Sequence, residues 1–541
     1  MVRIKNSSAL LIQRIASSIG MNKMKILILL IVFTKIIISQ DFQVSNNGAV
    51  VFGTHITSDS VGNIVIVWDD SRNIKIPYGG TGTEGDVYGQ RYNKFGQPIG
   101  GNFRISDDSI DTDISYASQF LVRVAMNKKG EFVVTWVDTR TTQSKSNQSA
   151  NFNIYAQRFD SGGNSIGNNF LVNDYITGGL TNPDIVIRDD GSFVIVWVNT
   201  LENNSIYMQS FDSSGSKIEQ NKKLELYGKQ TRLALFKNGD ILVASDSTAQ
   251  IWSFPSYQIK DSFDIPFGYT KEIAVNKKDE IFIVQMENRF TTNKFLDSDI
   301  FLYKYDTLGN NLNRIKVNDD FTDYWQTNPT ISSNELYNFI AWQDYRNGYQ
   351  IGDGDCQDIY GQRFRQNLNK IGFNFKISHE NNGSVQFNPV TTLVNDSIYL
   401  AWLDGRSLES FPNVYPPQFK IDVWGTIQDF NHPIEGTIIR CYPPKFPDHT
   451  SVIFYPCYPN PTNSNVTFAY DLIEDSRIQL SIFNILGKEV KLLYSGFDTA
   501  GSYNRKFSIT YLPSGVYFAN LTVKNLNGGL QSHYIKVVLI K

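Results

Sequence analysis

The chain has 541 residues, of which 41% are hydrophobic and 19% are charged, so it carries enough apolar material for two or more folded domains. Lysine and arginine (50) nearly balance aspartate and glutamate (53), and the formal charge of −3 lacks the basic excess of nucleic-acid-binding proteins. Three cysteines and five histidines exclude a disulfide-dense scaffold and leave few ligands for a zinc site.

The first forty residues have the pattern of an export signal. A lysine-containing start precedes an apolar run over 25–39, which is too short to span about 30 Å of hydrocarbon as a helix. We expect cleavage near Ser39 or Gln40, and residues 1–20 are interpreted as an upstream extension of this signal region. The alternative is an N-terminal membrane anchor.

A repeated strand-rich unit fills residues 41–430. In each unit a polar turn and a strand of β-branched residues, such as Ile64–Trp68, precede a strand that carries an apolar–aromatic pair. A short further strand follows, for example Phe103–Ser106. The pair recurs seven times, at Val87-Tyr88, Ile154-Tyr155, Ile206-Tyr207, Ile251-Trp252, Ile300-Phe301, Ile359-Tyr360 and Val423-Trp424.

Four antiparallel strands in every unit predict a β-propeller. A lone four-stranded sheet cannot bury both of its faces, whereas radial stacking of such sheets can. We therefore expect an all-β chain with a seven-bladed propeller over 41–430, although the fourth and fifth units are degenerate and six or eight blades remain alternatives. The segment Phe42–Ser45 matches the last strand of a unit, and the seventh unit lacks one of its own. We expect this segment to complete the last blade and close the ring, because an open ring would expose a sheet edge.

Four units share the pattern Trp-x-Asp-x-Arg. Residues i, i+2 and i+4 of a strand point to one face, so the Trp is expected to pack between blades while the Asp and Arg continue toward the rim. One interpretation is a ring of charges that binds an anionic or sugar ligand. The alternative is a repeated structural ion pair that fixes the end of each blade. The four rows are Trp68-Asp70-Arg72, Trp136-Asp138-Arg140, Trp342-Asp344-Arg346 and Trp402-Asp404-Arg406.

Long loops follow these rows in the sixth, seventh, first and second units, which become neighbours once the ring closes. Tyr78, Tyr349 and Tyr415 lie in three of these loops. Because binding usually resides on long loops held by a rigid scaffold, we expect a contiguous rim that binds a glycan or a protein. The alternative is loop length without a ligand.

One of these loops contains a candidate calcium site. Asp353, Asp355 and Asp358 form a DxDxxD segment, and oxygen-rich loops suit calcium, but the set of ligands is shorter than in an EF-hand. A solvated turn is the alternative. No other cofactor is expected.

A proline-rich linker is expected over 431–456, followed by a C-terminal domain over 457–541. Cys441 and Cys457 bracket this linker and can form a disulfide in an oxidising compartment, with two free thiols as the alternative. Alternating apolar residues and glycine turns in the C-terminal domain predict an immunoglobulin-like β-sandwich.

The C-terminal domain also carries short motifs that are specific in combination: Pro459, Asn460 and Pro461 in YPNP, Leu486 and Gly487 in NILG, Gly515, Val516 and Tyr517 in LPSGVY, and the late Lys536. Together they resemble the type A C-terminal sorting domain of the type IX secretion system. The resemblance implies a cargo protein of a Gram-negative bacterium that the secretion machinery recognises and then releases or attaches to the outer-membrane surface. Any membrane association would then be through surface attachment. The Trp-x-Asp-x-Arg repeats also resemble propellers found in such cargo proteins.

Three functions remain open at this point. The first is a secreted or surface-attached module that binds glycans or proteins, the second is a propeller-fold polysaccharide hydrolase or lyase, and the third is a structural or adhesion component of the cell surface. Glycosidases commonly need two acids about 5–10 Å apart. The sequence offers no singular acid pair outside the repeated Asp, so we expect binding rather than catalysis.

Overall fold

The computed structural model describes residues 41–45, 50–72, 85–107, 118–140, 152–174, 179–289, 297–319, 325–346, 357–379, 385–406, 421–431, 433, 452–454, 457–472, 475–499, 501–525 and 530–541. The chain forms two compact units, Met1–Ile439 and Arg440–Lys541, and each is described by itself. The expected signal region over 1–40 lies outside the described residues. Within the described ranges, no helix is long and apolar enough to cross a membrane.

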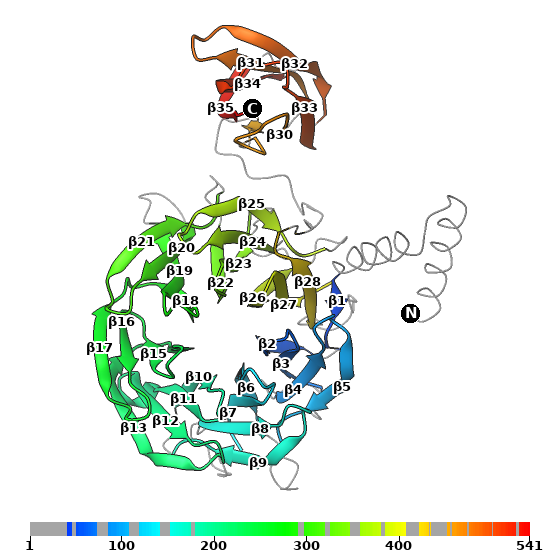
Figure 1. Cartoon of the computed structure of the whole chain (residues 1–541). Coiled ribbons are helices and arrows are strands. Elements are labelled where there is room, and N and C mark those ends of the chain that lie inside the picture. The colour runs from blue at the N-terminus through cyan, green and yellow to red at the C-terminus, as the bar shows by residue number, and fades with distance from the viewer. Residues whose placement is uncertain are drawn as a thin grey trace, which may run out of the picture. The chain divides into compact units, whose positions relative to one another are not determined.

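The described residues of the first unit form seven four-stranded antiparallel sheets arranged in a ring, which we number as blades 1 to 7 (Figure 1). Blades 1 to 3 consist of β2 (Val51–Ser58), β3 (Ile64–Asp70), β4 (Asp86–Tyr92), β5 (Pro98–Arg104); β6 (Gln119–Met126), β7 (Phe132–Asp138), β8 (Asn153–Phe159), β9 (Ser165–Leu171); and β10 (Leu180–Ile187), β11 (Phe193–Asn199), β12 (Ser205–Phe211), β13 (Lys217–Tyr227), with the short 3-10 helix η1 (Thr200–Glu202) after β11.

The remaining blades continue the same order from the ring axis outward. Blades 4 to 7 consist of β14 (Arg232–Leu235), β15 (Ile241–Ala244), β16 (Thr248–Trp252), β17 (Ile259–Asp264); β18 (Tyr269–Val275), β19 (Ile281–Arg289), β20 (Asp297–Tyr305), β21 (Asn311–Lys316); β22 (Gln326–Ser333), β23 (Tyr337–Asp344), β24 (Asp358–Arg365), β25 (Lys370–Lys376); and β26 (Gln386–Val394), β27 (Ser397–Asp404), β28 (Asp422–Asp429), β1 (Phe42–Gln43). The predicted all-β propeller class is confirmed.

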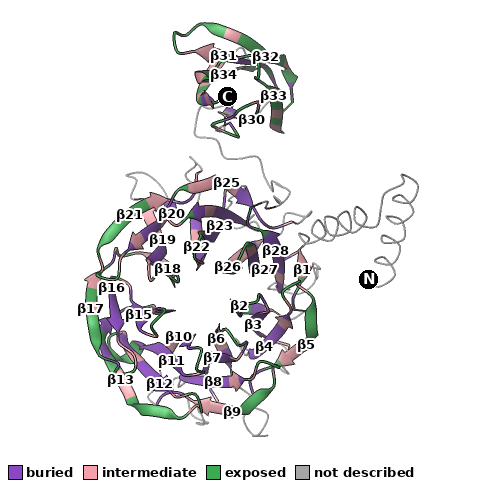
Figure 2. Cartoon of the chain, viewed as in Figure 1, coloured by how far each residue is buried: buried purple, intermediate pink, exposed green. Residues whose placement is uncertain are grey.

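Burial explains why the second strand of a blade is so rich in β-branched residues. In β3, β7 and β11 every residue is buried, because neighbouring blades cover both faces of the sheet. The outer strands β5 and β9 are largely exposed and carry glycine and polar residues instead (Figure 2). The first strand of each blade lies nearest the ring axis (Figure 1).

The tryptophans pack between blades, as predicted. Trp68 of blade 1 belongs to one core cluster with Ala401 and Leu403 of blade 7. Trp136 of blade 2 shares a cluster with Val67 of blade 1. Both indole side chains are 0% exposed, so each row stabilises the contact between two neighbouring sheets.

The amino-terminal segment closes the ring, which confirms the predicted register. Phe42 pairs with Gly425 and Gln43 pairs with Trp424, so β1 is the outer strand of blade 7. Just before this strand, the Asp41 carboxylate accepts a hydrogen bond of 2.9 Å from Arg406. The first strand of blade 7 also contacts that of blade 1, which completes the circle.

The second unit is a β-sandwich of two antiparallel sheets around one hydrophobic core. One sheet has the order β29 (Val452–Phe454), β30 (Asn465–Leu472), β33 (Gly501–Ser508), and the other has the order β32 (Glu489–Asp498), β31 (Ser476–Asn484), β34 (Gly515–Asn525), β35 (Leu530–Leu539). Strand β29 lies inside the stretch that was expected to be linker. Its residues pair with β30, so the sandwich begins earlier than the proline pattern indicated.

Candidate functional site

The Trp-x-Asp-x-Arg row forms a compact network at the end of the second strand of a blade. In blade 1 the indole Nε1 of Trp68 donates a hydrogen bond of 2.8 Å to Asp70, and the Arg72 guanidinium donates to the same carboxylate at 2.9 Å. The guanidinium carbon lies 3.6 Å from the ring centre of Tyr88 on the adjacent strand. The Asp70 side chain is 0% exposed, so its carboxylate is fully used inside the protein.

The other three rows repeat this network and extend it to neighbouring strands. Each carboxylate accepts from its indole at 2.7–2.9 Å and from its Arg. Arg140 also pairs with Asp107 at the end of blade 1, and Arg346 pairs with Asp319 at the end of blade 5. This geometry corresponds to the structural alternative for Asp70, Arg72, Asp138, Arg140, Asp344, Arg346, Asp404 and Arg406, because the carboxylates are buried and already partnered.

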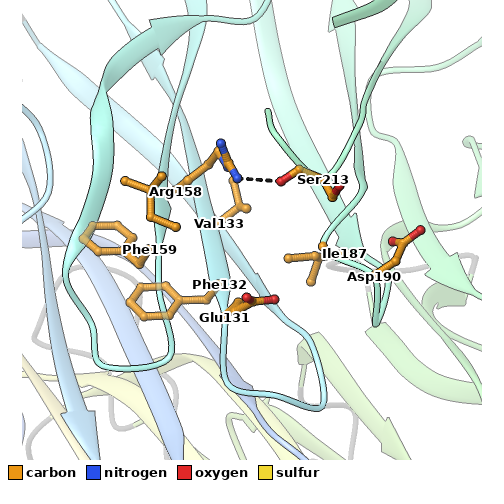
Figure 3. Close-up of a pocket in the computed structure, with 10 residues that line it drawn as sticks. Glu131, Phe132, Val133, Arg158, Phe159, Ile187, Asp190 and Ser213 are labelled. Carbon is orange, nitrogen blue, oxygen red and sulfur yellow. Dashed lines mark hydrogen bonds between the residues drawn. The ribbon is translucent and has the colours of Figure 1, made fainter. Parts of the chain in front are cut away.

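A second repeated residue has a structural role on the outer part of the ring. Arg158 of blade 2 donates a hydrogen bond of 2.8 Å to the carbonyl of Ser213, in a turn of blade 3 (Figure 3). Arg91 makes the same type of contact from blade 1 to blade 2, and Arg363 makes it from blade 6 to blade 7. The Arg of the Gln-Arg pair therefore joins blades 1, 2 and 6 each to the next blade.

A small pocket lies beside this contact, between blades 2 and 3. Phe132, Phe159 and Ile187 contribute apolar side chains to it, and Glu131 and Asp190 stand at its edge (Figure 3). Its volume is about 50 Å³, whereas ligand pockets are usually about 300 Å³ or larger. We interpret it as a packing void rather than a ligand site.

Several predicted site residues lie outside the described residues. These are the rim tyrosines Tyr78, Tyr349 and Tyr415, the acids Asp353 and Asp355 of the calcium segment, and Cys441. Asp358, the third acid of that segment, begins β24 and forms a buried ion pair of 2.7 Å with Lys376. Asp86 and Asp299 pair in the same way with Arg104 and Lys316, so Asp358 holds a repeated structural position. The parts of the chain that the structure describes contain no group of three or more acidic, His or Cys side chains that could hold a metal.

A different group of residues emerges on the inner strands, at positions that differ from blade to blade. The inner-strand residue opposite the residue before the Trp is His55 in blade 1, Arg123 in blade 2 and Asp184 in blade 3. Glu272 faces the ring interior from β18 of blade 5, and Arg232 lies at the start of β14 in blade 4. These five residues are called the inner-strand cluster below.

Ion pairs connect the cluster across four blades. The Arg232 Nε donates a hydrogen bond of 2.8 Å to Glu272, whereas Arg123 lies 3.7 Å from Glu272 and 3.9 Å from Asp184. Asp184 accepts a hydrogen bond of 2.7 Å from the backbone N–H of Leu233. The side chains of Arg123 and Glu272 are 20% and 28% exposed, so the cluster is in contact with solvent.

Burial and mutual repulsion shift the charges of this cluster. Burial lowers the pKa of the Arg123 guanidinium, and the neighbouring Arg232 lowers it further. Burial raises the pKa of the Asp184 carboxyl, although the two arginines oppose that shift. Burial, followed by the charge of Arg123, lowers the pKa of His55 well below its ordinary value, which keeps the imidazole neutral at pH 7. The cluster thus contains an incompletely neutralised arginine beside a carboxyl with weakened acidity.

Sequence motifs do not reveal the cluster, because its five members lie on five different sheets and each contributes a single polar or charged residue to its strand. A signal was nevertheless present. When the units are aligned by the pairing of their first two strands, the segments Val122–Met126, Pro183–Ile187 and Lys271–Val275 each place an ionisable residue at the same position. Burying such a residue costs free energy unless its charge is paired or remains in contact with water. In Arg123 the charge lies near two carboxyl groups and the side chain is partly exposed.

The motif residues of the second unit have identifiable structural roles. The Asn460 side chain donates to the carbonyl of Lys536 and accepts from the N–H of Val538, both at 2.7 Å, so the YPNP turn is attached to β35. Gly487 has a φ of +73° in the turn after β31, a conformation that favours glycine. In the same turn Leu486 is 86% exposed. The Tyr517 hydroxyl donates to the carbonyl of Pro513 at 2.9 Å.

Gly515 and Val516 open strand β34, and Pro459 and Pro461 flank Asn460 in the turn that precedes β30. Cys457 is a free, buried thiol whose Sγ lies 3.7 Å from the Lys536 carbonyl. Burial raises the pKa of this thiol to about 12, which makes it unreactive at neutral pH.

Comparison with solved structures finds distant likenesses in fold. A protein of unknown function from Dyadobacter fermentans DSM 18053 is 12% identical, with 72% of this chain and 98% of that chain covered and a TM-score of 0.39. The polysaccharide lyase Uly1 is 10% identical, with coverages of 73% and 99% and a TM-score of 0.43. The NanB sialidase from Streptococcus pneumoniae is 13% identical, with coverages of 73% and 71% and a TM-score of 0.39. The propeller assignment itself rests on the strand pairing described above.

No curated protein matched the chain. Residues 456–532 match the family of the secretion system C-terminal sorting domain. This range covers most of the β-sandwich and includes all of the motif residues from Pro459 to Tyr517. The C-terminal unit is therefore a sorting domain of the type IX secretion system, and the chain is a cargo protein of that system.

Proposed function

We propose that this secreted or surface-displayed cargo uses its propeller as a binding module for a glycan or protein ligand, and that the inner-strand cluster is the binding site. The observation that supports the proposal most directly is the Arg123 guanidinium, which is partly exposed and lies more than 3.5 Å from both carboxylates nearest to it. Its N–H groups make no side-chain hydrogen bond to any described residue. The N–H groups of such a guanidinium can donate hydrogen bonds to a ligand.

Repetition supports the same assignment. Residues that recur in the blades, such as Asp138 and Arg158, are occupied by contacts that hold a blade together or join it to the next one. A ligand without sevenfold symmetry is recognised best by residues that break the repeat. The inner-strand cluster is of this kind, because charges stand on blades 2 to 5 while Thr330 and Val390 occupy the corresponding register in blades 6 and 7.

The test measures which ligands the mature chain binds on a glycan array and in pull-downs from the culture medium of the cells that produce it. Arg123→Ala should lose at least about 10-fold in affinity for the captured ligand, as expected when a charged hydrogen bond is removed. Lys128→Ala is the matched control, because Lys128 is an exposed cation in the turn between β6 and β7 and pairs with Asp189 rather than with the cluster. Equal binding by both variants would show that the site lies elsewhere, and the proposal for the cluster would be wrong.

A polysaccharide hydrolase or lyase is the second candidate, and one observation favours it. Asp184 and Glu272 both flank Arg123, and burial raises the pKa of Asp184 while Glu272 pairs with Arg232. A carboxyl group with a raised pKa near a second carboxyl group is an arrangement that can supply an acid and a base or nucleophile. Release of reducing ends or unsaturated products that disappears in both Asp184→Asn and Glu272→Gln would support catalysis. Ligand binding without turnover would exclude it for the ligand concerned.

A further inference from the structure

The inner-strand cluster has a charge imbalance that indicates what kind of ligand it takes. Two guanidinium groups, Arg123 and Arg232, stand beside two carboxyl groups. Glu272 is committed to Arg232 by a hydrogen bond of 2.8 Å. Asp184 accepts a backbone N–H and is only 10% exposed, in surroundings that favour its protonated form. Arg123 is therefore the cation whose charge is least compensated.

The geometry of Arg123 fits a planar anion. Its distances of 3.7 and 3.9 Å to the two carboxyl groups are beyond hydrogen-bond range, so its fork of N–H donors is held in place by charge but remains unoccupied by these neighbours. A guanidinium presents parallel donors that match the two oxygens of a carboxylate, which an ammonium group cannot do. A carboxylate bound here would replace the missing hydrogen bonds and relieve the repulsion between Arg123 and Arg232.

The rest of the same layer is suited to an uncharged part of the ligand. Thr330 and Val390 hold the corresponding positions in blades 6 and 7, and His55 in blade 1 is neutral at pH 7 because burial lowers its pKa. The ring interior is thus polarised, with charges on blades 2 to 5 and uncharged side chains on the remaining inner strands. A sugar ring that bears a single carboxylate has this distribution of charge.

We propose that the inner-strand cluster binds an acidic saccharide through the carboxylate of a uronic acid residue, with the Arg123 guanidinium as the clamp. This inference rests on the proposed binding function of the same cluster and adds the chemical class of the ligand to it. Glu272 and Arg232 form a hydrogen-bonded pair that orients Arg123. Asp184 lies beside Arg123 and accepts a hydrogen bond from the backbone N–H of Leu233.

The experiment is isothermal titration of the mature full chain with homo-oligouronides of galacturonate, guluronate and mannuronate. The carboxyl-reduced, neutral form of each oligosaccharide serves as the matched probe. At least one oligouronide should bind, and its reduced form should bind about 10- to 100-fold more weakly, the range expected for hydrogen bonds to a charged group. Binding should also weaken with added salt, because the contact is ionic.

Variants separate a carboxylate clamp from a merely positive site. Arg123→Lys keeps the positive charge but loses the parallel N–H donors of the guanidinium, so it should lose most of the affinity. Lys128→Ala should behave like the wild type. The melting temperature of each variant shows whether it is folded.

The outcomes distinguish the carboxylate clamp from the proposed binding function of the cluster. Equal affinity for an oligouronide and its reduced form, or full affinity in Arg123→Lys, overturns the carboxylate clamp. Absence of binding to every oligouronide also overturns it, yet the proposed function still stands if another captured ligand is lost in Arg123→Ala. If no captured ligand responds to that variant, the proposed function itself fails.

Discussion

Two adjacent aspartates at the end of β3 should affect stability in opposite directions when replaced by valine. Asp70 accepts hydrogen bonds from Trp68 and Arg72, as described above. Asp69 is 1% exposed, and neither of its carboxylate oxygens has a hydrogen-bond partner among the described residues. A Cβ added at Gly53 would lie 2.8 Å from the Asp69 Oδ1, so glycine leaves the space that this carboxyl occupies.

The expected changes in the free energy of unfolding follow from the hydrogen-bond partners of each carboxylate. An unpaired buried polar group costs about 1–3 kcal/mol, and valine already fills the corresponding position in blades 2 and 3, where Val137 and Val198 are 0% exposed. Asp69→Val should therefore raise the free energy of unfolding by about 1–3 kcal/mol. Asp70→Val leaves a partly buried guanidinium and a buried indole N–H without their acceptor, which should cost about 3–5 kcal/mol. For a domain of this size these changes correspond to about 1–4 °C upward and about 4–6 °C downward in Tm.

Intrinsic fluorescence measures this contrast cleanly, because all eight tryptophans lie in the propeller and none in the sorting domain. Burial, with a smaller contribution from the charge of Asp70, raises the pKa of Asp69 well above its usual value. Its protonated form is thus favoured in the folded state, and the wild type loses stability as the pH rises from about 4 toward that raised pKa. The advantage of Asp69→Val should grow over the same interval. A lower melting temperature for Asp69→Val at pH 7 would refute the reasoning and indicate an unseen partner for this carboxyl.

The remaining predictions concern ring closure, the ligand site and export. Asp41→Asn weakens the contact with Arg406 and should lower the free energy of unfolding by about 1–3 kcal/mol, which an unchanged urea midpoint would contradict. Acidic-ligand binding should weaken as the pH rises through the raised pKa of Asp184, because a charged carboxylate then competes for Arg123, and Asp184→Asn should abolish this dependence. Deletion of 457–541 should leave the protein in the periplasm, as immunoblots of cell fractions would show; undiminished export would exclude a role for the sorting domain.

Much of the fold was predictable because each blade repeats the same physical problem. A sheet that is covered on both sides needs a strand such as Ile64–Asp70, and the indole, carboxylate and guanidinium of one row must point to one face. The closing strand was predictable for the same reason, since Phe42–Ser45 repeats the pattern of Phe103–Ser106. The boundary at β29 was not predictable. Val452–Phe454 is a short strand beside prolines, and only its pairing with β30 stabilises it as one.

The inner-strand cluster escaped prediction for a different reason. Asp184 and Arg232 lie within hydrophobic stretches that serve equally well as ordinary core strands, and nothing local shows that their side chains meet. The contact between Arg123 of blade 2 and Glu272 of blade 5 exists only because the ring brings non-adjacent sheets together. Motif spacing carries no information about such a contact, whereas alignment of the units does.

The repeat also explains where function can be placed on a propeller. Asp138 and Asp344 make the same ion pair with the Arg of their row in different blades. Changing either one therefore disturbs the packing at the end of its blade. The register of Arg123 is different, since the same position holds His55 in blade 1 and Thr330 in blade 6 without any change in the strand. The sheet accommodates all three residue types there, and in blade 2 the Arg123 side chain remains 20% exposed. Positions that the scaffold leaves unconstrained are those that a ligand can shape, and in this chain they carry an arginine that the protein itself does not satisfy.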